Sequence, residues 1–138
     1  MKIPQDTPFI DDIKSHYGLE GFDEDSQSLP INGHFVFIVQ VKGTSAPTLI
    51  LCTSIGEIPS QEQLPDMLQR AMSYQLHHLS QTGAALSLAP EGEFLALQKM
   101  IYPETADQAC REIDDFTAMA DDAGTSIFSA DFQELQER

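Results

Sequence analysis

Four histidines are among the side chains that could bind a metal ion, and their spacing decides whether they could do so together. They are His16, His34, His77 and His78. Adjacent residues on an α-helix point about 100° apart, so His77 and His78 cannot both face one metal ion unless the helix unwinds there. The sequence contains no H-x-x-x-H and no H-E-x-x-H pattern. We therefore expect no metal site, and we expect solvated or capping roles for the histidines.

Arrangements for nucleophilic or acid–base catalysis are also missing. No G-x-S-x-G elbow, S-x-x-K pattern or glycine-rich phosphate loop occurs. Carboxylates occur in runs at 11–12, 23–25 and 114–115, which is typical of solvated surface rather than of a buried catalytic pair. Cys52 and Cys110 form no C-x-x-C pair, and their apolar neighbours predict two small buried side chains. We expect a protein that is not an enzyme and that needs no cofactor.

Charge narrows the range of partners. The 138 residues include 22 acidic and 7 basic side chains, which gives a net charge of −15. Such a surface repels nucleic-acid phosphates and anionic membranes, so neither is expected as a partner. It favours partners with basic and apolar surface, although an acidic surface that only keeps the protein soluble is an equally weighted interpretation. The start of the chain has no apolar signal segment, and its reduced cysteines suit the cytoplasm.

Residues 59–83 predict a long amphipathic helix around which the chain is organised. Ser60 is the expected N-cap, with Gln63 three residues later, and Gly83 is the expected end. The apolar positions recur every three or four residues and share one face. They are Leu64, Met67, Leu68, Ala71, Met72, Leu76 and Leu79.

The remaining pattern predicts one α+β domain spanning 1–138. A short helix is expected after Thr7 and before Gly18, and a second from 105 to 123, where Gly124 should end it. Residues 126–138 are expected to form a flexible tail or a terminal helix. Strands are expected at 29–31, 35–41, 48–55, 84–89 and 94–102, and they give a twisted antiparallel sheet in the order α-β-β-β-α-β-β-α.

The strand at 35–41 is apolar on both of its faces. Phe35, Phe37 and Val39 point to one side, and Val36 and Ile38 point to the other. An antiparallel sheet can leave one face in water, so two apolar faces indicate that the second is also covered. A helix, a second subunit or a bound client could supply that cover.

From 48 to 103 the chain resembles the class I type III secretion chaperones, small acidic proteins that bind single effectors in the bacterial cytoplasm. A hydrophobic strand ends in the segment Gly56-Glu57-Ile58-Pro59, the long helix follows, and then comes the hairpin AALSLAPEGEFLALQKMIYP, which closes at Pro103. The first third of the chain matches this family in layout rather than in motif.

The resemblance implies a homodimer that holds the N-terminal chaperone-binding segment of an effector in extended form, with the secretion-apparatus ATPase as a further partner. Clients of this family lay apolar side chains into grooves and can add a strand to the sheet. Each candidate client-binding residue could instead belong to the core. The candidates are Phe9, Ile10, Ile13, Leu29, Ile31, Val36 and Ile38.

The dimer interface is expected on the long helix and on the hairpin after it, because these elements carry more apolar surface than one small sheet can cover. The candidates are Met67, Met72, Leu76, Leu86 and Leu88. Two other functions stay open: a regulatory protein of the same fold that sequesters a transcriptional activator or another chaperone, and a small enzyme or ligand-binding domain with a deep polar pocket.

Overall fold

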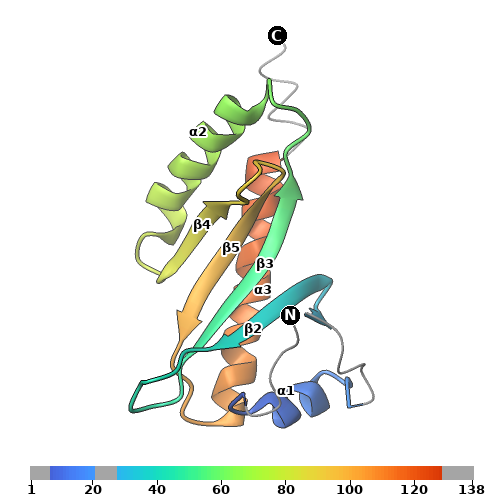
Figure 1. Ribbon diagram of the computed structural model, residues 1–138, viewed down its shortest axis with the longest axis vertical. Coiled ribbons are helices and arrows are strands. Elements are labelled where there is room, and N and C mark those ends of the chain that lie inside the picture. Colours follow the sequence, from blue (N-terminus) through green and yellow to red (C-terminus); the bar gives the residue numbers. More distant parts are fainter. Residues whose placement is uncertain (1–6, 21–27, 129–138) are drawn as a thin grey trace. The chain divides into compact units, whose positions relative to one another are not determined.

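The computed structural model describes residues 7–20 and 28–128. Over these residues the protein has the predicted α+β class, with three α-helices and a five-stranded antiparallel sheet (Figure 1). The strand order in the sheet is β1-β2-β3-β5-β4. The elements are α1 (Ile10–His16), β1 (Leu29–Ile31), β2 (His34–Gln40), β3 (Leu49–Glu57), α2 (Leu64–Tyr74), the π-helical turn η1 (Gln75–Leu79), β4 (Ala84–Leu88), β5 (Phe94–Ile101) and α3 (Ala106–Phe128).

The chain divides into two compact units. Of the described residues, unit 1 contains 7–20, 28–53 and 99–117, and unit 2 contains 54–98 and 118–128. Both units therefore draw residues from β3, β5 and α3. Residues 126–128 form the end of α3, whereas the rest of the predicted tail, 129–138, lies outside the described residues.

In unit 1 a tight turn fixes the register of the first two strands. Asn32 and Gly33 both have positive φ, 52° and 84°, as a two-residue type I′ hairpin turn requires. The turn pairs Leu29 with Val36 and Ile31 with His34. The predicted Asn-Gly turn is confirmed, and it places the aliphatic side chains of β1 on the same face as Val36.

That face is the core of unit 1. Val36 and Ile38 are buried, as are Leu49 and Leu51 of the neighbouring strand β3. The opposite face carries the cross-strand pairs Phe37–Cys52 and Val39–Ile50. Since Phe37 and Val39 are exposed, the alternation of β2 separates a covered face from an uncovered one among the described residues.

A polar network in unit 1 joins α1 and the β1–β2 turn to α3. Tyr17 donates a hydrogen bond of 2.7 Å to the Asp114 carboxylate and one of 3.1 Å to the backbone oxygen of Cys110. The Asn32 side-chain amide donates to the same carboxylate at 2.9 Å and to the Thr117 hydroxyl at 3.0 Å. These bonds connect segments far apart in sequence, so they hold the hairpin turn and α1 against α3.

Helix α1 begins later than predicted. Its N-cap is Phe9, which has a left-handed φ of 63°, and the helix starts at Ile10. Thr7 does not cap it: the Thr7 hydroxyl is buried and has no hydrogen-bond partner within residues 7–20 and 28–128, and the Thr7 carbonyl accepts the Ile10 N–H at 3.2 Å. Gly18, with a φ of 71°, follows the helix as predicted.

Helix α2 also starts later, because residues 61–63 form turns ahead of it. The Gln63 N–H donates to the Ser60 carbonyl at 3.2 Å, and the N-cap is Gln63 without a side-chain cap. The prediction of Ser60 as N-cap is therefore wrong. Pro65 lies in the first turn of the helix, where the proline N–H would have no helical partner in any case.

Helix α3 is longer than predicted, because Gly124 lies inside it rather than at its end. In unit 2, a Cβ atom added to Gly124 would lie 3.0 Å from the backbone oxygen of Ile55. A Cβ added to Gly56 would lie 2.6 Å from the ring of Phe128. Glycine at both positions lets the end of α3 lie directly against the end of β3. Gly124 therefore permits close packing between the two elements and does not end the helix.

Replacing Gly124 with valine should destabilise the protein by about 1–3 kcal/mol, because the added side chain must push α3 away from the Ile55 carbonyl. Helix propensity alone favours valine over glycine, so a loss of stability isolates the steric effect. Urea unfolding followed by circular dichroism measures the change. Ser126→Val, at an exposed position two residues later, is the control and should change little. Equal or higher stability of Gly124→Val would contradict the packing described here.

Candidate functional site

The α2–β4 groove is an apolar depression in unit 2, formed by α2, η1 and β4 with one residue of β5. It has a volume of about 370 Å³. None of its ten lining side chains carries a charge, although the chain as a whole has a net charge of −15. The lining residues are Leu68, Ala71, Met72, Gln75, Leu76, Ser80, Leu86, Ser87, Leu88 and Leu95.

Large apolar side chains stand exposed around this groove. Met72 is 71% exposed and Leu76 is 67% exposed, one helical turn apart, and Leu88 of β4 is also exposed. Together with Leu86, these are four of the five residues predicted for the dimer interface, and the structure brings them to one surface. The fifth, Met67, is only 2% exposed. Met67 was predicted for the dimer interface with the other four, but it lies on the face of α2 that packs into the core and does not line this surface.

The connection between η1 and β4 is short and held by hydrogen bonds, which fixes the position of the strand beside the helix. The Thr82 hydroxyl donates to the Leu79 carbonyl at 2.8 Å and accepts the Ala84 N–H at 3.1 Å. Gly83 between them has a φ of 82°, a conformation that glycine adopts without strain. β4 therefore begins at Ala84, after a short connection from the helical segment, and Figure 1 shows α2 alongside it.

Gln75 bridges the groove by binding the backbone of β4. The Leu86 N–H donates to the Gln75 side-chain oxygen at 2.7 Å, and the Gln75 side-chain nitrogen donates to the Ala84 carbonyl at 3.4 Å. Gln75 is also the first residue of the π-helical turn, a feature often found at functional positions in helices. Sequence reasoning did not identify Gln75, because a glutamine in an amphipathic helix looks like ordinary surface.

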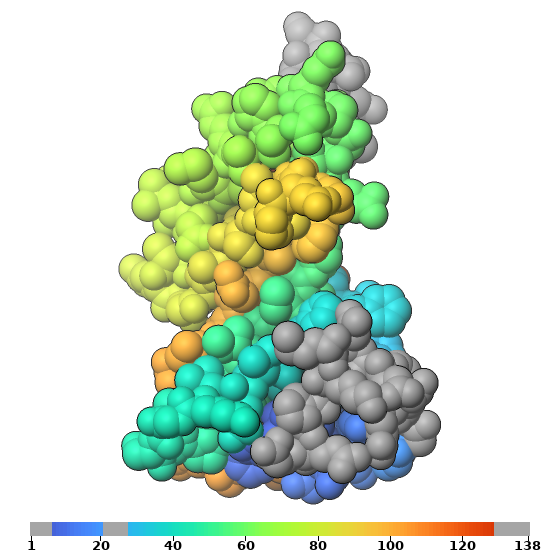
Figure 2. Space-filling view, viewed as in Figure 1, coloured from blue at the N-terminus to red at the C-terminus, as the bar shows by residue number. Residues whose placement is uncertain are grey.

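A second apolar surface lies in unit 1, on the uncovered face of β2. Phe35 is 66% exposed, and Phe37 and Val39 are exposed as well. The half-exposed Ile50 and Cys52 of β3 extend this face through their pairing with Val39 and Phe37. Residues of β2 and β3, in cyan to green, reach the surface in the space-filling view (Figure 2). We call this surface, Phe35, Phe37, Val39, Ile50 and Cys52, the β2 face.

The residues predicted to bind a client lie elsewhere. Phe9 is partly exposed, but six of the seven are buried, so the prediction that they line an accessible groove is wrong. The physical reason is that these side chains face inward: the Asn-Gly turn pairs Leu29 with Val36 on the covered face of β2, and the apolar residues of α1 are buried in the same unit. The six are Ile10, Ile13, Leu29, Ile31, Val36 and Ile38.

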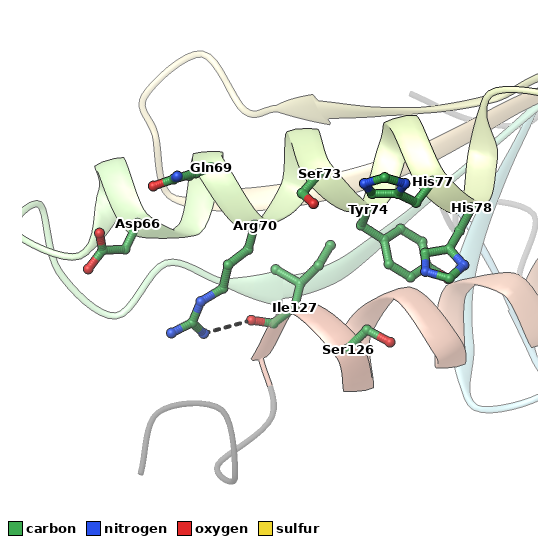
Figure 3. A pocket seen from close by; sticks show the side chains of 9 residues that line it. All are labelled: Asp66, Gln69, Arg70, Ser73, Tyr74, His77, His78, Ser126 and Ile127. Carbon is green, nitrogen blue, oxygen red and sulfur yellow. Dashed lines mark hydrogen bonds between the residues drawn. The ribbon is translucent and has the colours of Figure 1, made fainter. Parts of the chain in front are cut away.

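A polar pocket of about 450 Å³ lies in unit 2, where α2 and η1 meet the end of α3 (Figure 3). Arg70 donates a hydrogen bond of 3.0 Å to the Ile127 carbonyl near the C-terminus of α3. His77 and His78 both line the pocket, and the His78 ring centroid lies 4.7 Å from that of Tyr74. Both histidines belong to the π-helical turn η1. Among the described residues, no group of three histidine, cysteine, aspartate or glutamate side chains could hold a metal ion.

Two tyrosines have pKa values raised by their surroundings. Burial, the hydrogen bond to Asp122 and the charge of that carboxylate raise the pKa of Tyr74 above its usual value near 10. Burial, the hydrogen bond to Asp114 and nearby negative charge raise the pKa of Tyr17 in the same way. Burial also raises the pKa values of the Cys52 and Cys110 thiols, which disfavours the reactive thiolate.

No protein-family model matches the chain, and no curated protein matches it at a significant level. Over residues 7–20 and 28–128, no helix is long and apolar enough to cross a membrane. The functional assignment therefore depends on the surfaces and contacts described above.

Stability should fall as the pH rises above about 10, because the unfolded state then releases the tyrosine protons before the folded state does. Below that pH both states keep the protons and this contribution is complete. Tyr74→Phe should reduce the slope of unfolding free energy between pH 9 and 11, and should cost about 1–2 kcal/mol at pH 8 through the lost hydrogen bond. Denaturant titrations at several pH values measure both effects. Tyr102→Phe, at an exposed position, is the control, and identical slopes for Tyr74→Phe and wild type would contradict the prediction.

Proposed function

We propose that this protein is a non-enzymatic type III secretion chaperone that binds the N-terminal segment of an effector in extended form. The observation that carries the proposal is the exposure of Phe35, Phe37 and Val39 along one strand of an otherwise strongly acidic protein. Soluble proteins rarely leave a continuous row of large apolar side chains in water without a binding partner. A chaperone needs such a row, because its client is held before its own apolar residues are buried.

The β2 face suits an extended client in its spacing as well as its chemistry. Phe35, Phe37 and Val39 recur every second residue along a strand, which is also the period of side chains on one side of an extended segment. Every second side chain of an extended client could therefore contact one of these three residues. The negative charge of the protein favours clients with basic residues beside their apolar ones.

We propose further that the chaperone is a homodimer formed through the α2–β4 groove, with its chain following the α-β-β-β-α-β-β-α order of the family. Two protomers with charges of −15 each repel one another, so an uncharged contact surface costs least. The lining of the groove is uncharged. Burial of exposed Met72 and Leu76 would contribute about 1.5–3 kcal/mol for each side chain.

Substituting Leu76 with glutamate should dissociate the dimer, because a carboxylate would enter the apolar contact in two symmetric copies. Size-exclusion chromatography with light scattering over a range of concentrations gives the mass, and circular dichroism checks the fold. Gln69→Glu places the same charge at an exposed position of α2 outside the groove and should leave the dimer intact. A folded dimer for Leu76→Glu would show that the interface lies elsewhere.

Substituting Phe35 and Phe37 with serine should weaken client binding by at least tenfold without dissociating the dimer, because the two rings supply most of the exposed aromatic surface of β2. The assay is co-expression with the N-terminal segments of type III effectors, followed by purification and determination of the ratio of chaperone to segment. We expect two chaperones per segment. The control Ser73→Ala changes an exposed polar residue of α2, which contributes no residue to the β2 face, and should retain binding. A strictly monomeric wild-type protein that captures none of these segments would overturn the proposed function.

A further inference from the structure

Strand β4 lies at one edge of the sheet, next to β5 only. An edge strand presents backbone N–H and C=O groups that can pair with a strand from another chain. The N–H of Ala89, the residue that follows β4, donates a hydrogen bond of 3.0 Å to the carbonyl oxygen of Phe94 in β5. Because these groups alternate in direction along a strand, Leu86 and Ala84 direct their backbone groups away from β5.

Gln75 occupies two of those outward groups, and the Thr82 hydroxyl accepts a third, the Ala84 N–H, at 3.1 Å. Gln75 accepts the Leu86 N–H at 2.7 Å and donates to the Ala84 carbonyl at 3.4 Å. The Gln75 amide directs its oxygen and one N–H toward the same strand edge, so it pairs with β4 as the N–H and C=O of one residue on a neighbouring strand would. Glutamate could accept from Leu86 but could not donate to Ala84.

We propose that Gln75 closes the edge of β4 to strand addition, so that the α2–β4 groove binds a helix of a second copy through side chains and not an extended segment through backbone pairing. This inference builds on the proposed homodimer. The α2–β4 groove would then bind a helix of the second copy, whereas extended client segments would bind at the β2 face.

The shape of the exposed surface fits a helix. Met72 and Leu76 are four residues apart and project from neighbouring positions on one side of the helical segment, as contact residues between packed helices do. A two-fold dimer uses the same patch from both protomers, so an uncharged patch meets an uncharged patch. No backbone pairing is needed for that contact, and Gln75 remains bound to its own β4.

The test compares Gln75→Met with wild type. Methionine keeps the length and the apolar character of the groove but removes both hydrogen bonds to β4. Amide hydrogen exchange of Leu86, read by NMR, should be about tenfold faster in Gln75→Met, which corresponds to the loss of the hydrogen bond from the Leu86 N–H to the Gln75 side chain. Light scattering should show assemblies larger than a dimer, because the opened edge can pair with other chains. Gln69→Met, on the same helix but outside the groove, should match wild type in both measurements.

Each outcome bears on a distinct part of the proposal. Unchanged Leu86 exchange in Gln75→Met would overturn the edge closure. A monomeric wild-type protein with a protected Leu86 amide would overturn the helical partner and the homodimer while supporting the closure. Should Gln75→Met fail to fold, Gln75→Glu gives the same test, because it retains only the bond from Leu86 and should show exchange between the two extremes.

Discussion

The alternation of side chains along β2 determines where this protein places its apolar surface. One set of residues, Val36 and Ile38, is buried in unit 1, so the other set must point away from that core. The other set consists of aromatic and branched residues rather than polar ones. A single register, fixed by the Asn32–Gly33 turn, therefore produces both a stable core and a row of exposed apolar side chains. A shift of one residue would exchange the two sets.

Local patterns in the sequence predicted most of the fold. Period-two and period-3.6 spacing located all five strands and the helices, and the Asn-Gly pair predicted the first hairpin turn. Helix ends were less predictable, because tertiary contacts decided them. Gly124 looked like a terminator, yet it lies inside α3 where the helix meets the Ile55 carbonyl. The spacing of residues around Gly124 cannot predict that β3, from a distant part of the sequence, packs against this position.

The sequence predicted one of the two candidate surfaces and missed the other, and the reason is physical. A sequence shows that a residue is apolar but not whether its face is covered. Reasoning about surplus apolar area on the long helix found Met72, Leu76, Leu86 and Leu88, which lie together at the α2–β4 groove. The same reasoning chose the buried face of β2 over the face with Phe35, because both faces are apolar and only the packed structure distinguishes them.

The close approach of α3 to β3 in unit 2 links two positions that are distant in sequence. Gly56 leaves the space that the Phe128 ring fills, and Gly124 faces the same strand. Related chains should therefore vary these positions together: a larger residue at 56 should accompany a smaller one at 128. A Cβ atom at position 124 would meet the backbone oxygen of Ile55. A substitution cannot make a backbone atom smaller, so position 124 should stay glycine. Such a pattern of linked substitution would identify distant relatives whose overall sequences have diverged.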